Sequence, residues 1–369
     1  MIRLRRGTVV EVVGQRPGAL EVLVEVEGTR AVAVAYPGLV GPVAPGDRVL
    51  LNTTAVHLGL GTGGVHFVVG VEGGPDLDPE PAGHVMKLRY TPLQAKVLAV
   101  EEPGSPHREA FLRTEDLEGL PVVWVPLHGM LGAACAGARA AGARRVVYVM
   151  TDGAALPLAF SRQVAAVREA GLLDGVVTCG QAFGGDLEAV TVFSGLLAAK
   201  SVAGAEVAVV GDGPGKVGTE TRWGASDVAS GLALVAAHAV GGRPVAALRV
   251  SFADPTYRHY GVSPHSLTVL ARVALVPVHV AVPALEGERR EAVWRALRGA
   301  RLEERHQLVE VTGQPAVDLL RERGLPAETM GRTLDRDPEF FLAAGAAGVL
   351  AGRMAAGQRA WRAEGRPGR

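Results

Sequence analysis

The sequence predicts an α/β fold in which a small N-terminal β-barrel precedes a doubly wound, mostly parallel sheet. Short apolar runs spaced by glycine and proline turns fill the first 72 residues, whereas after residue 83 apolar runs alternate with longer helical patterns. Between them, the stretch GGPDLDPEPAG concentrates glycine, proline and acidic residues, as linkers do. We therefore expect three parts, which are a barrel domain over 1–72, a linker over 73–83 and an α/β domain over 84–369.

The N-terminal part predicts five short strands rich in valine and leucine, over residues 8–13, 20–26, 30–35, 47–52 and 65–71. Five strands in so short a segment favour a closed barrel, because closure removes exposed strand edges. Some small barrels bind oligonucleotides through exposed aromatic rings, but this segment offers only Tyr36 and Phe67. Packing or self-association is therefore the preferred role, and oligonucleotide binding is the third-ranked hypothesis.

The remainder predicts eight strands separated by helices, as expected for a parallel sheet covered on both faces. The strands are expected over 96–100, 121–125, 145–150, 175–180, 205–210, 245–252, 276–282 and 307–312. The helices are expected over 129–142, 157–171, 187–201, 226–240, 265–274, 288–300, 314–323 and 338–360. Right-handed crossovers place the carboxyl ends of such strands at one edge, where ligands bind at the point at which the strand order reverses.

The composition indicates a large apolar core and a cytoplasmic location. Of the 369 residues 48% are hydrophobic, and the formal net charge is zero, which argues against a nucleic-acid partner because such a surface needs a concentrated basic field. The two cysteines, Cys135 and Cys179, are expected as reduced core thiols. We expect no secretory leader, because the apolar run after the N-terminal arginines is broken by Glu11 and lacks a cleavage site. We also expect no membrane partner, because the apolar stretch 340–352 is shorter than the roughly 20 residues of a membrane helix and fits a buried packing helix.

The most informative motif is the glycine-rich loop that follows an apolar strand in AEVAVVGDGPGKVGTETRWG. It fails the Walker pattern, because Val210 replaces the first glycine and Val217 follows the lysine. Gly213, Gly215 and Gly218 match the dinucleotide pattern literally, but no helix opens inside the motif and no acidic residue follows at the expected spacing. An anion site and a loop that uses glycine only for tight turning are therefore equally compatible with the sequence.

Lys216 shifts this balance toward an anion site. The chain has four lysines (Lys87, Lys96, Lys200 and Lys216) against 34 arginines, so a position that keeps lysine favours a compact ammonium over a planar guanidinium. We therefore expect this loop to hold a phosphate or carboxylate, and the candidate ligand-binding residues are Gly213, Gly215, Lys216, Gly218, Thr219 and Arg222.

Other polar residues follow the predicted strand ends and are expected at the same edge of the sheet. The candidates for acid–base catalysis near neutral pH are His128, Asp152 and His259. Further candidate ligand contacts are Asp186, Asp254 and His265. No metal site is predicted, because the six-residue spacing of His259 and His265 is not a metal-binding spacing on one helix face; a site formed by them with Asp254 or Asp152 is the less favoured alternative.

Several of these residues also have a purely structural interpretation. Asp152 and Asp186 precede predicted helices and fit N-caps, and Glu188 fits a first helical turn, where the helix dipole favours an acid. Ser263 fits an N-cap with Pro264 at the first helical position.

No nucleophile signature accompanies these candidates. The sequence has no Gly-x-Ser-x-Gly elbow, and Cys179 has no evident histidine partner. The reaction, the cofactor and enzymatic activity itself are therefore not predicted. The favoured hypothesis is a protein that binds a small anionic ligand at the carboxyl edge of the sheet, with acid–base catalysis as its extension; the alternative is a noncatalytic oligomeric scaffold or ligand sensor.

Five long strings of the sequence are distinctive, namely LNTTAVHLGLGTGGVHF, HVMKLRYTPLQ, YVMTDGAALPLAFSR, CGQAFGGDLEAVTVFSGLLAA and SFADPTYRHYGVSPHSLT. They resemble an uncharacterised bacterial family, the domain-of-unknown-function family numbered 3866. The resemblance implies no activity and no catalytic residues. Gln181 and Ser266 stand where histidine is expected in that pattern, which argues against metal binding at these positions.

Overall fold

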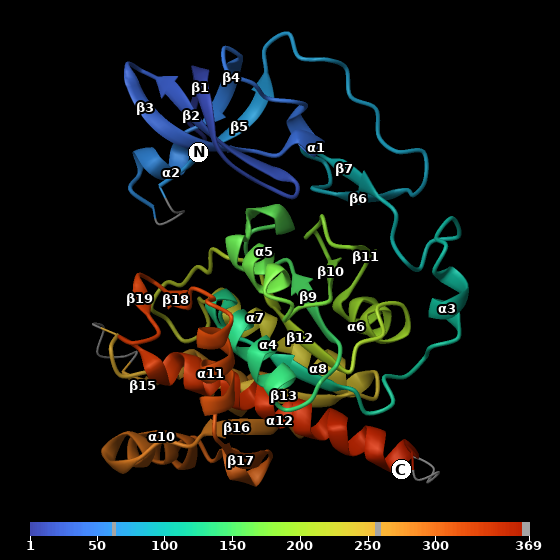
Figure 1. Ribbon diagram of the computed structural model, residues 1–369, viewed down its shortest axis with the longest axis vertical. Coiled ribbons are helices and arrows are strands. Elements are labelled where there is room, and N and C mark those ends of the chain that lie inside the picture. Colours follow the sequence, from blue (N-terminus) through green and yellow to red (C-terminus); the bar gives the residue numbers. More distant parts are fainter. Residues whose placement is uncertain (61–63, 255–259, 364–369) are drawn as a thin grey trace. The chain divides into compact units, whose positions relative to one another are not determined.

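The computed structural model describes residues 1–60, 64–254 and 260–363, with the side chains described up to residue 357. The chain forms two compact units (Figure 1). The first contains Met1–Val97 and Ala159–Ala165, and the second contains Leu98–Leu158 and Ala166–Arg369. The predicted linker 73–83 has no helix or strand and lies inside the first unit.

The first unit contains the predicted barrel, which is closed in the strand order β1-β2-β3-β5-β4. Its strands are β1 (Leu4–Arg16), β2 (Ala19–Val26), β3 (Thr29–Ala35), β4 (Arg48–Asn52) and β5 (His66–Val71). Alternate residues of these strands, including Val22, Val24, Val49 and Leu51, are fully buried in one apolar core. The prediction of a small closed barrel is therefore confirmed, and its interior is built from apolar side chains.

Short elements accompany the barrel in the first unit. They are the helices α1 (Pro37–Val40) and α2 (Thr54–His57) and the hairpin of β6 (Val85–Lys87) and β7 (Ala95–Val97). The strand predicted over 96–100 is only partly found in the large sheet, because its first residues pair with β6, while Ala99 forms an isolated parallel bridge with Glu188 of the three-residue strand 187–189.

The second unit is built on an eight-stranded parallel sheet in the order β11-β10-β9-β12-β8-β13-β16-β17, which confirms the predicted α/β fold (Figure 1). The strands are β8 (Pro121–Trp124), β9 (Val146–Thr151), β10 (Gly175–Cys179), β11 (Leu187–Ala189), β12 (Val207–Asp212), β13 (Arg243–Ala247), β16 (His279–Pro283) and β17 (Gln307–Val311).

One strand of this sheet, β11, lies where a helix was expected. Helix α6 (Val192–Ser201) begins five residues later than predicted, and Thr191 is its N-cap. Glu188 is therefore not in a first helical turn; it is a buried strand residue whose Oε1 accepts a hydrogen bond from Gly184 N at 2.7 Å. A three-residue strand is too short to produce a detectable period of two, so tertiary pairing with β10 decides its structure.

Helices cover both faces of the sheet. Helices α6, α8 (Leu232–Ala239) and α10 (Gly287–Gly299) pack on one face, whereas α4 (Leu131–Ala140), α11 (Gln314–Glu322) and α12 (Pro338–Ala363) pack on the other. Shorter helices are α3 (Arg108–Leu112), α5 (Arg162–Glu169), α7 (Ser226–Ser230) and α9 (Pro264–Thr268), the last followed by a π-helical turn at Val269–Val273. Two antiparallel hairpins are formed by β14 (Val250–Ser251) with β15 (Gly261–Val262) and by β18 (Glu328–Thr329) with β19 (Arg332–Thr333).

Glycines allow α4 and α12 to pack with their backbones in close approach. A Cβ atom on Gly137 would lie 2.3 Å from Gly345 O, and one on Gly348 would lie 2.0 Å from Ala134 O. Among the described residues, one helical stretch, Pro338–Gly357, is long and apolar enough to cross a membrane. However, 72% of its most apolar part is buried inside the protein. The expected buried packing helix is therefore confirmed, and it is longer than its apolar stretch.

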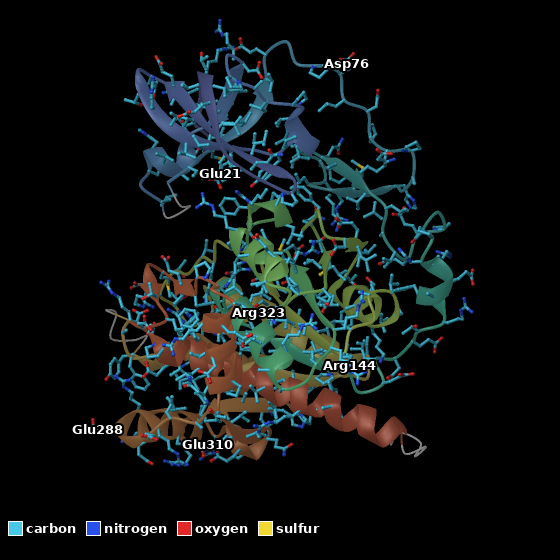
Figure 2. The ribbon with its side chains drawn as sticks, viewed as in Figure 1. Glu21, Asp76, Arg144, Glu288, Glu310 and Arg323 are labelled. Carbon is cyan, nitrogen blue, oxygen red and sulfur yellow. The ribbon has the colours of Figure 1, made fainter. Side chains whose placement is uncertain are left out.

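Charged side chains are also found on the outside of the second unit. Figure 2 shows Glu288 of α10 and Glu310 of β17 at this surface. Glu310 accepts two hydrogen bonds from Arg290, at 2.7 and 3.0 Å, and both residues are substantially exposed. Such pairs contrast with the charges at the carboxyl edge of the sheet, several of which are buried.

Candidate functional site

The strand order reverses between β8 and β12, which are neighbours at the centre of the sheet. From β8 the chain crosses to β9 on one side, whereas from β12 it crosses to β13 on the other side. Connections that leave neighbouring strands in opposite directions open a crevice at the carboxyl ends of those strands. The residues that follow β8, β9, β12 and β13 therefore form the candidate site.

Asp212, the last residue of β12, lies at the centre of this edge. Its Oδ1 atom accepts hydrogen bonds from Thr151 Oγ1 at 2.6 Å and from Gly153 N at 3.1 Å. No donor in the part of the chain that the structure describes bonds to its Oδ2 atom. Burial raises the pKa of Asp212 above its usual value, although the two hydrogen bonds oppose this shift. Asp212 thus combines an unused carboxylate oxygen with an increased tendency to hold a proton.

His128 follows β8 and lies beside the backbone of Asp212. Its Nδ1 atom is 3.1 Å from Asp212 O, which can only accept, so Nδ1 carries the proton. The Tyr148 hydroxyl donates to the same carbonyl at 2.8 Å. Burial lowers the pKa of His128 to about 4, so the imidazole is neutral near pH 7. These contacts give His128 a structural role in joining the ends of β8 and β12, and its predicted catalytic role remains a prediction.

Lys216 and Asp227 form a buried ion pair next to this point. Lys216 belongs to the loop after β12, its side chain is 19% exposed, and Asp227 of α7 is fully buried. Burial lowers the pKa of Lys216, whereas the charge of Asp227 opposes that shift. His265 Nδ1 lies 4.0 Å from Asp227 Oδ1, and its Nε2 atom lies 3.1 Å from Thr221 O. A lysine predicted as an anion ligand is therefore already paired with an aspartate of its own chain.

The glycine-rich loop folds as a small hairpin. Thr219 N donates to Gly224 O at 2.7 Å, and Val217 N donates to Ser226 Oγ at 3.3 Å, so these two amides are used within the loop. Gly213 permits a close approach, because a Cβ atom there would lie 2.6 Å from Ala155 O. Gly215 has a φ of 97°, which favours glycine. Close packing therefore accounts for Gly213, and the backbone turn accounts for Gly215. Gly218, Thr219 and Arg222 are exposed on the hairpin.

A second charged cluster lies after β13. Arg249 and Arg332 pair with Asp254 at 3.2 and 3.3 Å, and Arg332 also pairs with Asp337 at 2.9 Å. Asp337 is fully buried and accepts a hydrogen bond from Ser251 Oγ at 2.8 Å. Burial lowers the pKa of Arg249, and the nearby aspartates oppose this shift. This cluster ties the hairpin of β18 and β19 and the start of α12 to the segment that follows β13.

The structure brings several predicted residues to this edge. His128, Lys216, Asp254 and His265 lie in the contacts described above. Asp152 is exposed there, accepts a hydrogen bond from Gln181 N at 2.8 Å, and its charge contributes to the raised pKa of Asp212. Asp152 therefore bridges two loops and does not cap a helix.

The expected position of Asp186 is wrong. The chain turns back after β10, so Asp186 lies at the amino end of that strand, where it accepts a hydrogen bond from Val176 N at 2.8 Å and pairs with Arg168. It precedes the strand β11 and so does not cap a helix either. The N-cap predicted at Ser263 is confirmed, because its Oγ atom accepts from His265 N at 3.3 Å. His259 lies outside the described residues.

The sequence reasoning missed important members of the site. Asp212 and Asp227 had a usable signal, because they lie on either side of the glycine-rich loop and the first directly ends an apolar strand. Arg249, Arg332 and Asp337 had none, since Arg332 lies 78 positions from its partner Asp254 and Asp337 lies 86 positions from its partner Ser251. Across the described ranges, no three His, Cys, Asp or Glu side chains are grouped so that they could hold a metal ion.

Comparisons with other proteins give a family but no activity. The family model described as Protein of unknown function (DUF3866) matches residues 32–348. No significant match was found among curated proteins or among solved structures.

Proposed function

The chain belongs to the DUF3866 family, whose description assigns no activity, and we propose from the geometry of its site that it binds a small ligand at the carboxyl edge of the sheet and exchanges a proton with it through Asp212. The observation that carries this proposal is the Asp212 carboxylate. It lies at the point of strand reversal with one oxygen held by Thr151 and Gly153 and the other unused by the described residues. This arrangement orients a carboxyl group without consuming its capacity to react.

Proton exchange is the chemistry that this environment favours. A carboxyl group with a raised pKa holds its proton closer to neutral pH, and it is therefore a better general acid or base there than an ordinary aspartate. The neighbouring Asp152 carboxylate is exposed, so the site faces solvent on this side. A ligand with hydroxyl or amino donors fits these two carboxylates.

An anionic ligand is the second candidate, and Lys216 supports it. Its ammonium contacts one carboxylate among the described residues, that of Asp227, and a phosphate or carboxylate of a ligand would compete for the same charge. We also include a cytoplasmic location in this proposal, because Cys135 and Cys179 are both buried and neither is in a disulfide.

Ligand binding to matched variants tests the proposal. Polyols, amino acids and sugar phosphates are screened by thermal shift and then by calorimetry against the unmodified protein, Asp212→Asn and Asp186→Asn. We expect stabilisation of the unmodified protein and of Asp186→Asn, whose exposed carboxylate lies at the amino end of β10, and loss of binding in Asp212→Asn. Equal binding by both variants, or no binding to the unmodified protein, would contradict the proposal.

A further variant separates the two ligand classes. Lys216→Met removes the ammonium and leaves Asp212 in place. If the ligand is anionic, sugar phosphates should bind the unmodified protein and lose their affinity in this variant, whereas uncharged polyols should not. If binding depends on Asp212 alone, polyols and amino acids should bind and Lys216→Met should keep their affinity.

A further inference from the structure

Lys216 differs in its surroundings from the other lysines of the chain. Lys96 contacts a backbone carbonyl, that of Glu80, and Lys200 pairs with the exposed Glu118 at 3.7 Å. Lys87 is fully buried in β6 of the first unit. Lys216 alone among the four follows a central strand of the parallel sheet, and its partner is a fully buried carboxylate. It is therefore the lysine placed where an α/β sheet binds its ligand.

The ion pair with Asp227 supplies what an amine nucleophile needs. A protonated lysine has no lone pair, so it reacts only after a base takes its proton. The Asp227 carboxylate contacts Nζ, and no other described donor forms a hydrogen bond with its oxygens. Burial of both groups weakens the solvation that keeps the ammonium charged, which agrees with the lowered pKa of Lys216.

The loop that carries Lys216 is exposed, although the Nζ atom itself is buried against Asp227. The residues on either side of it, Gly215 and Val217, are exposed, and the lysine side chain itself is 19% exposed. Gly215 carries no side chain to cover the lysine. A small molecule that binds at this edge would reach the buried amine by displacing part of this exposed loop.

We propose that Lys216 captures the carbonyl group of a small aldehyde or ketone as an imine, with Asp227 as the base that activates the amine and Asp212 as the nearby acid. This inference rests on the proposed function, because it requires that a small molecule reaches the carboxyl edge. It names the class of that molecule, a carbonyl compound, and it assigns to a buried pair a chemical role in place of a purely structural one.

The reaction balances without an oxidant or a reductant. Asp227 takes a proton from the ammonium, and the Nζ lone pair then attacks the carbonyl carbon, so that a C–N bond forms while the carbonyl oxygen takes the proton of Asp212. The nitrogen gives a second proton to the Asp212 carboxylate, which leaves a neutral carbinolamine. Asp212 donates this proton to the hydroxyl, the C–O bond breaks, water leaves, and the nitrogen lone pair completes the C=N bond of a protonated imine.

Reductive trapping tests the inference directly. The full chain is incubated with pyruvate or with glyceraldehyde, sodium borohydride is added, and the stable secondary amine is located by peptide mass spectrometry. Because the chain has only four lysines, each modified site is identified without ambiguity. We expect an adduct at Lys216 that saturates with carbonyl concentration, and slow, non-saturating modification of Lys96 and Lys200, which serve as internal controls.

Two variants, each first shown by circular dichroism to be folded, test the roles of the amine and of the base. Lys216→Arg keeps the positive charge but forms no imine, so the saturable adduct should disappear while the circular dichroism spectrum is retained. Asp227→Asn keeps the size of the side chain and removes the base, and we expect trapping to be about a hundredfold slower, with the loss partly restored at alkaline pH. A trapping rate unchanged in folded Asp227→Asn would overturn the role of this carboxylate.

The outcomes also separate this inference from the proposed function. If polyols or amino acids bind in a manner that depends on Asp212 but neither carbonyl compound is trapped at Lys216, the imine inference is overturned and ligand binding stands. If neither binding nor trapping occurs, both fail. Modification spread evenly over Lys96, Lys200 and Lys216 would also overturn the inference, because it would show no special reactivity.

Discussion

The barrel and the carboxyl edge of the parallel sheet bury opposite kinds of chemistry. The barrel core consists of valine, alanine and leucine side chains such as Val22, Val49 and Leu51, and charged pairs such as that of Arg5 and Glu27 lie on its surface. At the carboxyl edge, by contrast, Asp227, Arg249 and Asp337 are themselves buried. The first arrangement maximises apolar burial, whereas the second loses hydration energy that ion pairing only partly restores.

This difference indicates where the fold has been adapted to something other than stability. Replacing a buried ion pair by apolar residues of similar volume is often neutral or stabilising, so the Lys216–Asp227 pair is not required to make this topology stable. Sequences depart from the locally most stable choice chiefly at functional or strained sites. The pair lies at the strand reversal, and its location is therefore an independent reason to look for function there.

The largest expected effect comes from breaking the buried pair on one side. Asp227→Ala leaves the Lys216 ammonium unpaired, and we expect the free energy of unfolding to fall by about 3–5 kcal/mol. Urea unfolding followed by tryptophan fluorescence measures this, because all four tryptophans lie after residue 97. Asp186→Ala, which removes an exposed partner of Arg168, is the matched control and should cost no more than about 1 kcal/mol.

A double variant sharpens this first prediction. In Lys216→Met combined with Asp227→Leu neither charge remains, and most of the lost stability should return while imine trapping does not. If the double variant is as unstable as Asp227→Ala, the pair is needed for packing, and the contrast between the two regions loses its functional meaning.

The barrel core should respond to lost volume. Leu51→Ala removes a fully buried side chain from the apolar cluster, and we expect a cost of about 2–5 kcal/mol, because the cavity adds to the lost transfer free energy. Leu51→Met, which conserves volume, should cost less than about 1.5 kcal/mol. Hydrogen exchange of the amides in β1 to β5 reports on this unit. Similar losses in both variants would show that volume is not what the core requires.

The fold was predictable because its signals are local and repeated. Apolar runs with turn residues between them gave the five barrel strands, and the alternation of strands and helices gave seven of the eight parallel strands. The exception, β11, has three residues and depends on pairing with β10. Three residues are too few to show an alternating pattern, so the sequence predicts β11 as the first turn of α6 and the start of that helix five residues too early.

Only those site residues that directly follow a strand could be placed from the sequence, because the direction of the parallel strands determines their edge of the sheet. The rule that parallel strands end at one edge correctly placed His128 and Lys216, but it failed for Asp186 because the chain reverses within the loop after β10. The pairing of Arg332 with Asp254 spans 78 positions. Nothing in the local sequence of either residue indicates the other, since such contacts arise from how the hairpin of β18 and β19 packs.

Acid should weaken the second unit through His128. Burial holds the pKa of this imidazole at about 4, below its value of 6.5 when unfolded, so its contribution to stability is present above pH 6.5 and is lost as pH falls through about 4. Because the ring is partly exposed, we expect about 1–3 kcal/mol between pH 7 and pH 4. His128→Gln should remove this part of the pH dependence in urea unfolding. An unchanged slope between pH 7 and pH 4 in the variant would assign the acid sensitivity to other groups.

The smallest effect is expected where a charged pair lies on the barrel surface. Hydrogen bonds from Arg3 and Arg5 lower the pKa of Glu27 to about 2, so its contribution to stability is present above its ordinary value of 4.5 and is lost only as pH falls toward 2. The carboxylate is exposed, however, and exposed pairs are weakened by solvent and salt. Glu27→Gln should therefore leave the unfolding midpoint at pH 7 unchanged within error. In the unmodified protein, an NMR titration of Glu27 should still show the low pKa. A loss as large as that of Leu51→Ala would mean that the barrel, like the carboxyl edge, depends on its charges.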